Sequence, residues 1–298
     1  MTETTVLNDT PRAQREGYEN EDRAQRNAAR AEAVAAVARE FAAAVDEEGR
    51  FPREAIDEAR TQGLLGAPMS EADGGLGWSI TELCRMLERV GRECTSTAMI
   101  LAMHHSQTLC LTRHADTEYL RDFTRRVATE GLLLASATTE VNIGGNTRSS
   151  TCAVRPAGDG RVHLHKTCPV ISYGAYADAI LVTARASEEA ASSDQVLLVV
   201  ESADLQLERQ RGWDALGMRG TCSESFELDA TTRADAVFTA LFETISAQTM
   251  LPGAHCLWAS AWLGMATQAG LTARSVVQKA ARKTPGTTPP SALRLAEL

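Results

Sequence analysis

The stretch "LLLASATTEVNIGGN", residues 132–146, carries several groups that could bind a polar ligand. An apolar run typical of a buried strand ends at Thr138, Thr139 and Glu140, and Gly144–Gly145 follow. A hydroxyl can both donate and accept a hydrogen bond, and glycine lets a ligand approach the backbone closely. The stretch therefore predicts either a ligand-binding strand end or an ordinary capped strand followed by a tight turn.

The histidines offer a second possible chemistry, metal binding. His104 and His105 are adjacent, and His163 and His165 would share one face of a strand. Neither pair has Asp, Glu or Cys partners at a ligating spacing, so the sequence predicts structural histidines rather than a metal site. Phosphate-loop, dinucleotide-binding and nucleophile-elbow motifs are also missing from the sequence.

Composition narrows the classes of protein. The chain has 298 residues, 44% of them apolar, and a net charge of -9, which argues against nucleic-acid binding and against docking on an anionic membrane. Apolar runs stay well short of the ~20 residues of a membrane span. The seven cysteines form no C-x-x-C pair, and the acidic N-terminus is not a signal peptide, so we expect a reduced, cytoplasmic protein.

The sequence predicts three regions that position these candidate residues: a helical region, a β region and a second helical region. Residues 1–26 read as a disordered lead-in, and helical periodicity then dominates residues 27–130, with a capping-box pattern at Ser79 and Glu82. Residues 131–237 change to β-strand patterns, including a hairpin over residues 151–165. Residues 238–298 return to helix. The expected fold class is α+β with several domains.

Six segments in this order resemble one family. They are "LLGAPMSEADGGLG", "ATTEVNIGGN", "VISYGAYADAILVTAR", "LGMRGTCSESFEL", "RKTPG" and "SALRLAEL". Together they make residues 30–298 similar to the acyl-CoA dehydrogenases, flavoproteins that bind FAD. The resemblance implies an N-terminal all-α domain, a central β-barrel-like domain and a C-terminal helical bundle, which would be incomplete in this C-terminally short chain.

The same resemblance implies which residues contact the flavin. Thr138 and Thr139 match the strand end that meets the flavin edge, and Gly145 would allow close approach. Ile171 and Ser172 match a segment whose hydroxyl lies near the reactive nitrogen of the flavin. A solvent-facing turn serine is the simpler alternative for Ser172.

Four further residues follow from the resemblance. Arg282 and Thr284 match a segment that reaches a neighbouring subunit and holds the cofactor's pyrophosphate, although a basic helix end is the plain alternative. Met99 and Met103 match a helix that helps to wall the acyl pocket, although core packing would also explain them.

The implied function is FAD-dependent α,β-dehydrogenation of an acyl-CoA by a homodimer or homotetramer, with an electron-transfer flavoprotein as acceptor. The catalytic residue is unknown, because the family's early position for a carboxylate base falls on Ala254, followed by His255. Glu243 would lie about 16 Å away along a helix. Because no carboxylate base is found, three alternatives stay open: a fragment of a longer enzyme, a non-catalytic partner subunit, or a flavin-dependent monooxygenase of the same fold.

Overall fold

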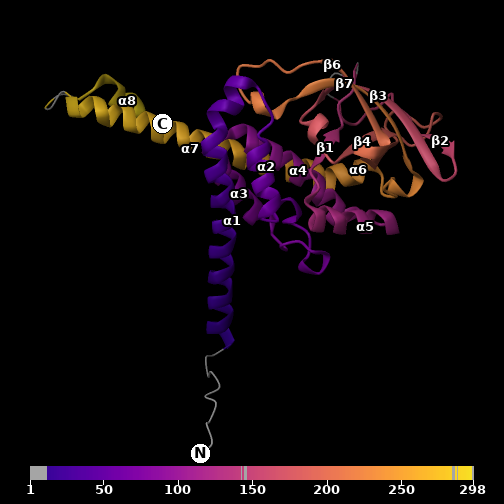
Figure 1. Cartoon of the computed structure of the whole chain (residues 1–298), viewed down its shortest axis with the longest axis horizontal. Coiled ribbons are helices and arrows are strands. Elements are labelled where there is room, and N and C mark those ends of the chain that lie inside the picture. Colours follow the sequence, from indigo (N-terminus) through magenta and orange to yellow (C-terminus); the bar gives the residue numbers. More distant parts are fainter. Residues whose placement is uncertain (1–11, 142, 144–145, 284–285, 287, 297–298) are drawn as a thin grey trace, which may run out of the picture.

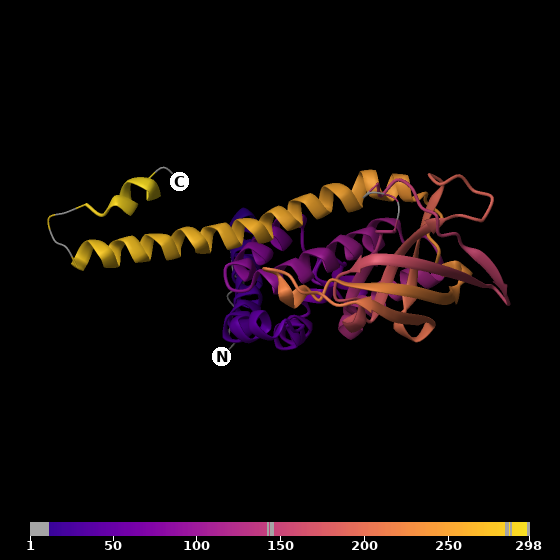
Figure 2. The same cartoon turned by 90° about the horizontal axis from the view of Figure 1, so that it is seen from above.

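The computed structural model describes residues 12–141, 143, 146–283, 286 and 288–296. Helices of the first third pack beside a small β domain, and one long helix runs from the β domain across the helical part and beyond it (Figure 1, Figure 2). The α+β class expected from the sequence is confirmed. No helix in the described part of the chain has both the length and the apolar character that a membrane crossing requires.

The N-terminal domain contains α1 (Arg12–Glu48), α2 (Arg53–Thr61), α3 (Ile80–Gly91), α4 (Thr95–His114) and α5 (Glu118–Arg126), which ends in a π-helical turn, Val127–Gly131. The capping box predicted at Ser79 is present, because Glu82 N–H donates to the serine hydroxyl and the Glu82 carboxylate accepts from Ser79 N–H. Helix α4 is the central element, buried along most of its length.

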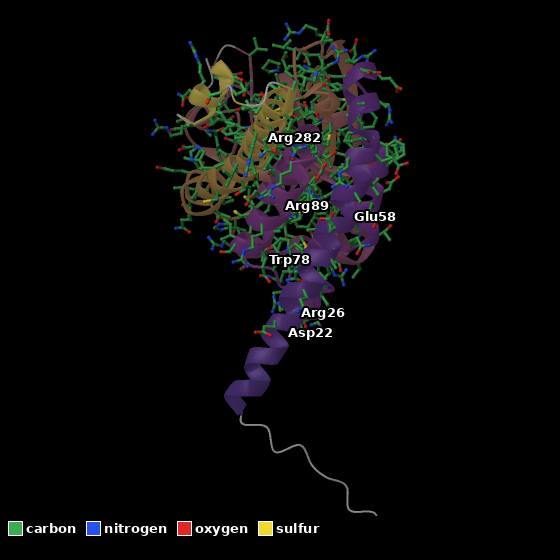
Figure 3. All side chains as sticks on the ribbon, turned by 90° about the vertical axis from the view of Figure 1, so that its left-hand side faces the viewer. Asp22, Arg26, Glu58, Trp78, Arg89 and Arg282 are labelled. Carbon is green, nitrogen blue, oxygen red and sulfur yellow. The ribbon has the colours of Figure 1, made fainter. Side chains whose placement is uncertain are left out.

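Residues 12–26, expected from the sequence to be part of a disordered lead-in, are helical in the structure. They form the first turns of α1, which project away from the body of the molecule around Asp22 and Arg26 (Figure 3). The polar composition of this segment favours disorder when it is considered from the sequence alone. Its Arg, Glu, Gln and Ala residues are nevertheless good helix formers, so the helix extends without an apolar face to pack.

Two sheets form the central domain. The three-stranded sheet has the order β1–β4–β5, with β1 (Leu134–Ala137) parallel to β4 (Ala179–Arg185) and β5 (Gln195–Glu201) antiparallel to β4. The other is antiparallel in the order β2–β3–β7–β6, made of β2 (Arg155–Gly158), β3 (Arg161–Ile171), β7 (Glu224–Arg233) and β6 (Leu205–Arg211). The predicted hairpin is β2–β3.

Side chains from both sheets share one core. Ala135, Ile180 and Val182 of the first sheet belong to the same buried cluster as Leu164 and Phe226 of the second. The sequence pattern does not predict strand β6, because only Leu205 and Leu207 are apolar in it and the rest of the strand is largely exposed.

The C-terminal part contains α6 (Phe242–Ile245), a π-helical segment (Ser246–Met250), α7 (Leu251–Lys283) and α8 (Pro290–Leu295). The first half of α7 packs on α3 and α4, and its second half extends past them (Figure 2). Glycines allow the α3–α7 crossing: a Cβ on Gly264 would lie 2.3 Å from Glu88 O, and one on Gly91 2.5 Å from Ala261 O.

Candidate functional site

A cavity of about 270 Å³ lies where α4 and the start of α7 meet the ends of β1 and β3. Its polar wall comes from the two strand ends and its other walls from the helices. The β domain contributes Ser136, Thr138, Thr139, Thr147, Val170, Ser172 and Tyr173, and the helical segments contribute Met103, Ser106, Gln107, Phe242, Ser246, Met250, Leu251, Ala254 and Trp258. The structure thus brings Thr138, Thr139 and Ser172 together, as expected from the sequence.

Strand alternation decides which side chains reach this cavity. On the β1 segment, Ser136 and Thr138 line the cavity, whereas the side chain of Ala137 between them is buried in the core. On the β3 segment, Val170 and Ser172 line the cavity and Ile171 between them is fully buried. The side chain of Ile171 therefore faces the core, and a contact of this residue with the cofactor stays a prediction.

The two strand ends are tied together. The Thr139 hydroxyl donates to Val170 O at 2.9 Å, and Val141 N–H donates to Thr167 O at 3.3 Å. The Thr138 hydroxyl has no protein partner among the described residues and faces the cavity. The polar wall is thus one cross-linked surface with a free hydroxyl on it.

Glu140 has a structural role. Its carboxylate accepts from the hydroxyls of Ser150 and Thr151 and from the backbone N–H of Thr151 and Cys152, the latter two at 2.9 Å. Burial acts to raise the pKa of Glu140, but the hydrogen bonds from Thr151 and Ser150 and the charge of Lys166 outweigh it, so the pKa lies below its ordinary value. Glu140 therefore anchors the loop that follows β1.

Lys166 holds the other side of the same strand end. Its fully buried ammonium donates to Ala137 O at 3.0 Å and to Thr183 O at 2.7 Å, and it lies 3.9 Å from a Glu140 oxygen. Desolvation lowers the pKa of Lys166. The ammonium satisfies the carbonyl of the last β1 residue and so fixes the point from which Thr138 enters the cavity.

His104 connects α4 to the start of β1. Its Nε2 donates to Leu65 O at 2.7 Å and its Nδ1 accepts from Leu134 N–H at 3.0 Å, which defines a neutral tautomer. Complete burial lowers the pKa of His104 to about 4. Among the described residues, no three His, Cys, Asp or Glu side chains are grouped as a metal site would require.

A chain of hydroxyls runs behind Ser172. Ser172 Oγ lies 2.8 Å from Ser223 Oγ, which lies 2.8 Å from Thr221 Oγ1, and Thr221 donates to Met218 O at 2.9 Å. Tyr173 N–H also donates to Thr221 O at 2.8 Å. The backbone around this chain is unusual, because Tyr173, Met218 and Cys222 have φ values of 44°, 53° and 43°. Strained backbone of this kind is often found at functional sites.

The helical walls supply two polar atoms that lack partners within the described structure. They are Gln107 Oε1 on α4 and Trp258 Nε1 on α7, an acceptor and a donor, both buried from solvent. Buried polar atoms are normally hydrogen-bonded, so an unpaired acceptor and an unpaired donor on the walls of one cavity indicate a ligand site. The described lining residues include no Asp, Glu, His, Lys or Arg, and Ala254 occupies the position expected for a base.

A second cavity of about 480 Å³ adjoins the first. The two share Thr147, Phe242, Ser246 and Leu251, and the second also contains the charged residues Arg148 and Glu243. Arg148 is exposed and has no ion-pair partner among the described residues. Glu243 lies on this second cavity and not on the wall that holds Ala254.

The remaining predicted residues are dispersed. Met103 lines the cavity, whereas Met99 is a core residue with 7% exposure and is not among the residues that line it, so its contact with the substrate stays a prediction. Met99 lies about one helical turn before Met103 on α4, about 6 Å away along the axis. Arg282 lies in the last turn of α7, 28 residues or about 42 Å along the helix from Ala254 (Figure 3). Gly145 and Thr284 lie outside the described residues.

Sequence reasoning missed most of the helical wall. Gln107 follows Met103 by four residues, and Trp258 follows Ala254 by four, so helical spacing from the two expected residues would have found both. Ser223 and Thr221 gave no such signal, because a loop and a different strand bring them behind Ser172.

The fold is α+β, and its cavity lies between a helical domain and a small β domain. Residues 19–151 match the family model described as acyl-CoA dehydrogenase, N-terminal domain. Cyclohex-1-ene-1-carbonyl-CoA dehydrogenase of Geobacter metallireducens is 34% identical over 179 residues, which cover 59% of this chain and 47% of the relative. Part of the chain is thus similar to the acyl-CoA dehydrogenase family, and the chain spans about half the length of the curated relatives it matches.

Solved structures share the fold. Butyryl-CoA dehydrogenase from Megasphaera elsdenii superposes with a TM-score of 0.74 and 20% identity, covering 90% of this chain and 74% of its own. The dibenzothiophene monooxygenase TdsC from Paenibacillus sp. A11-2, in a complex with FMN and indole, gives a TM-score of 0.75 and 23% identity, covering 85% and 65%. The same architecture is thus found in a dehydrogenase and in a monooxygenase.

Proposed function

We propose that the cavity binds the ring system of a flavin, FAD, against the wall formed by Thr138, Thr139 and Ser172. The observation that carries this proposal is the meeting of those three hydroxyls, from two strand ends, in one cavity. The donor set fits the group. A flavin edge presents both donors and acceptors, and the wall offers hydroxyls together with the unpaired Gln107 Oε1 and Trp258 Nε1. A flavin would supply the redox chemistry, and these residues would bind and orient it.

The second cavity suits the rest of an acyl-CoA thioester. Met103 and Trp258 give apolar contact beside the polar wall, and the shared lining residues make a continuous path from them to Arg148. A guanidinium binds phosphate oxygens in pairs, so Arg148 would contact the phosphates of coenzyme A. The proposed activity is acyl-CoA dehydrogenation with an electron-transfer flavoprotein as acceptor, and it rests on the similarity to acyl-CoA dehydrogenases and on this path.

A second candidate, a flavin-dependent monooxygenase, is favoured by one specific observation. Dehydrogenation of a thioester needs a group that accepts the Cα proton, and the described wall offers Ala254 where a carboxylate was expected. Oxygenation of a substrate by a flavin supplied in reduced form makes no such demand. The third possibility from the sequence, a non-catalytic partner subunit, would also lack a base.

One anaerobic experiment separates these functions. Purified protein is mixed with FAD and a panel of acyl-CoA esters, and the visible absorbance of the flavin is followed. Loss of absorbance on adding an ester supports the dehydrogenase. Reduction only by an added flavin reductase, followed by oxygen uptake when air is admitted, supports the monooxygenase. If FAD stays free during gel filtration and its fluorescence is unchanged by the protein, flavin binding itself is refuted.

A further inference from the structure

The hydroxyl chain behind Ser172 has a fixed direction. Thr221 Oγ1 lies 2.9 Å from Met218 O, and a carbonyl oxygen can only accept, so the single Thr221 proton points at Met218. The same carbonyl also accepts from Trp213 Nε1 at 3.2 Å and from the backbone N–H of Thr221 at 3.0 Å. The series of hydroxyls behind Ser172 therefore ends at Met218 O, an atom that accepts hydrogen bonds and cannot donate one.

The direction of the Thr221 hydrogen bond determines which oxygen is the donor in the other two contacts, Ser223–Thr221 and Ser172–Ser223. Each hydroxyl has one proton, and each oxygen–oxygen contact of 2.8 Å needs one between its atoms. Since the Thr221 proton is used, Ser223 donates to Thr221. Since the Ser223 proton is then used, Ser172 donates to Ser223. Ser172 Oγ is left with lone pairs and no proton for a ligand in the cavity.

Two other hydroxyls in the cavity also use their proton within the protein and can only accept a hydrogen bond from a ligand. Thr139 donates its proton to Val170 O at 2.9 Å, and Ser106 donates its proton to Ala102 O at 3.0 Å. Gln107 Oε1 adds a further unpaired acceptor. The cavity therefore offers several acceptors to a ligand, and the one at Ser172 is held by a buried relay that cannot rotate without breaking two hydrogen bonds.

We infer that the Thr221–Ser223 relay makes Ser172 a permanent hydrogen-bond acceptor, and that the site therefore binds reduced flavin more tightly than oxidised flavin. The inference rests on the proposed flavin site. Reduction adds N–H groups to ring nitrogens that carry only lone pairs in the oxidised ring, so an acceptor stabilises the reduced form and repels the oxidised one. Ser223 and Thr221 act through Ser172 and are positioning residues.

The test compares dissociation constants for oxidised and dithionite-reduced FMN and FAD by anaerobic titration calorimetry. In the wild-type protein we expect the reduced form to bind about tenfold more tightly, the effect of roughly one hydrogen bond. By linkage, this ratio corresponds to a rise of about 30 mV in the two-electron potential of the bound flavin.

The variant Ser223→Ala removes the acceptor for the Ser172 proton, which is then free to point into the cavity. Binding of oxidised flavin should strengthen and binding of reduced flavin should weaken, so that the ratio falls about tenfold. Changes of opposite sign distinguish a relay from a packing role, which would weaken both forms. Thr221→Val should act in the same direction and serves as the second variant if Ser223→Ala does not fold.

Ser225→Ala is the matched control, because Ser225 lies two residues away on β7 and its hydroxyl donates to Cys168 O outside the relay. The ratio of its dissociation constants for oxidised and reduced flavin should equal that of the wild type. Equal affinity of the wild type for the two redox forms, with no change in Ser223→Ala and Thr221→Val, overturns the relay inference and leaves flavin binding standing. Failure to bind either form of FMN or FAD overturns both.

Discussion

His104 Nδ1 accepts a hydrogen bond from the backbone N–H of Leu134, 3.0 Å away, and so joins α4 to the first residue of β1. The contact lies behind the cavity wall, and it requires a neutral imidazole. Burial favours the same form and lowers the pKa of His104 to about 4. The position of the polar wall is thereby coupled to the protonation of a residue that is not part of the cavity lining.

Stability should fall in mild acid because of this histidine. The pKa of His104 is lower in the folded state, about 4, than its ordinary value of 6.5, so the unfolded state binds the extra proton between these values. The contribution of neutral His104 to the free energy of unfolding is complete above pH ~6.5. It is lost at roughly 1.4 kcal/mol per pH unit as the pH falls toward ~4. Urea denaturation at several pH values should give a shallower slope for His104→Gln. His255→Gln, at an exposed position on α7, should keep the wild-type slope.

Lys166 should be among the most sensitive positions of the β domain. Lys166→Met leaves Glu140 buried without its counter-charge and Ala137 O without its donor, so we expect a loss of about 3–5 kcal/mol in unfolding free energy. The double variant Lys166→Met/Glu140→Gln should lose less than the sum of the two single variants. Additive losses in urea denaturation would argue against coupling between the two groups.

Ala254→Glu tests whether the cavity lacks only a proton acceptor. The new carboxylate would face the cavity, where general-base catalysis contributes about 10²–10⁴-fold. The expected result is faster loss of flavin absorbance when acyl-CoA is added without oxygen. Ala259→Glu places the same side chain on an exposed face of α7 and should give no gain. No gain in a folded, flavin-binding Ala254→Glu protein would weaken the dehydrogenase proposal.

Arg148 should contribute to binding of coenzyme A esters. Arg148→Gln removes a guanidinium on the second cavity, and we expect a several-fold weaker binding of an acyl-CoA, with a smaller dependence on salt concentration. Arg125→Gln, on α5 and paired with Asp122, is the control and should bind normally. Equal affinities for Arg148→Gln and the wild type would place the nucleotide elsewhere.

The close crossing of α3 and α7 should tolerate no side chain at Gly264. A Cβ there would lie 2.3 Å from Glu88 O, which is backbone and cannot move aside, so Gly264→Ala should destabilise the protein by about 1–3 kcal/mol. Gly270→Ala, six residues later on the same helix, meets no atom within 4 Å and should be neutral or stabilising by roughly 0.5–1 kcal/mol. The thermal unfolding temperature should therefore fall for Gly264→Ala and should stay the same or rise for Gly270→Ala.

The sequence was sufficient for features that depend on local pattern. The helix capped by Ser79, the β2–β3 hairpin and the strand end at Thr138 are all predictable, because capping, turn residues and apolar runs act over a few residues. The acceptor polarity of Ser172 was not predictable. It depends on Thr221 and Ser223, about fifty residues away, and on where one carbonyl lies in space. Glu140 was ambiguous for the same reason, since its partners, 150–152, lie across a loop.

The cavity wall draws on residues from Met103 to Trp258, so its formation requires contacts between segments far apart in the chain. Long-range contacts of this kind tend to form late in folding. A molecule that recognises the finished wall then meets it only after the folding barrier has been crossed. Added flavin should therefore slow unfolding and leave the refolding rate unchanged, so that it prolongs the lifetime of the native chain without guiding its formation.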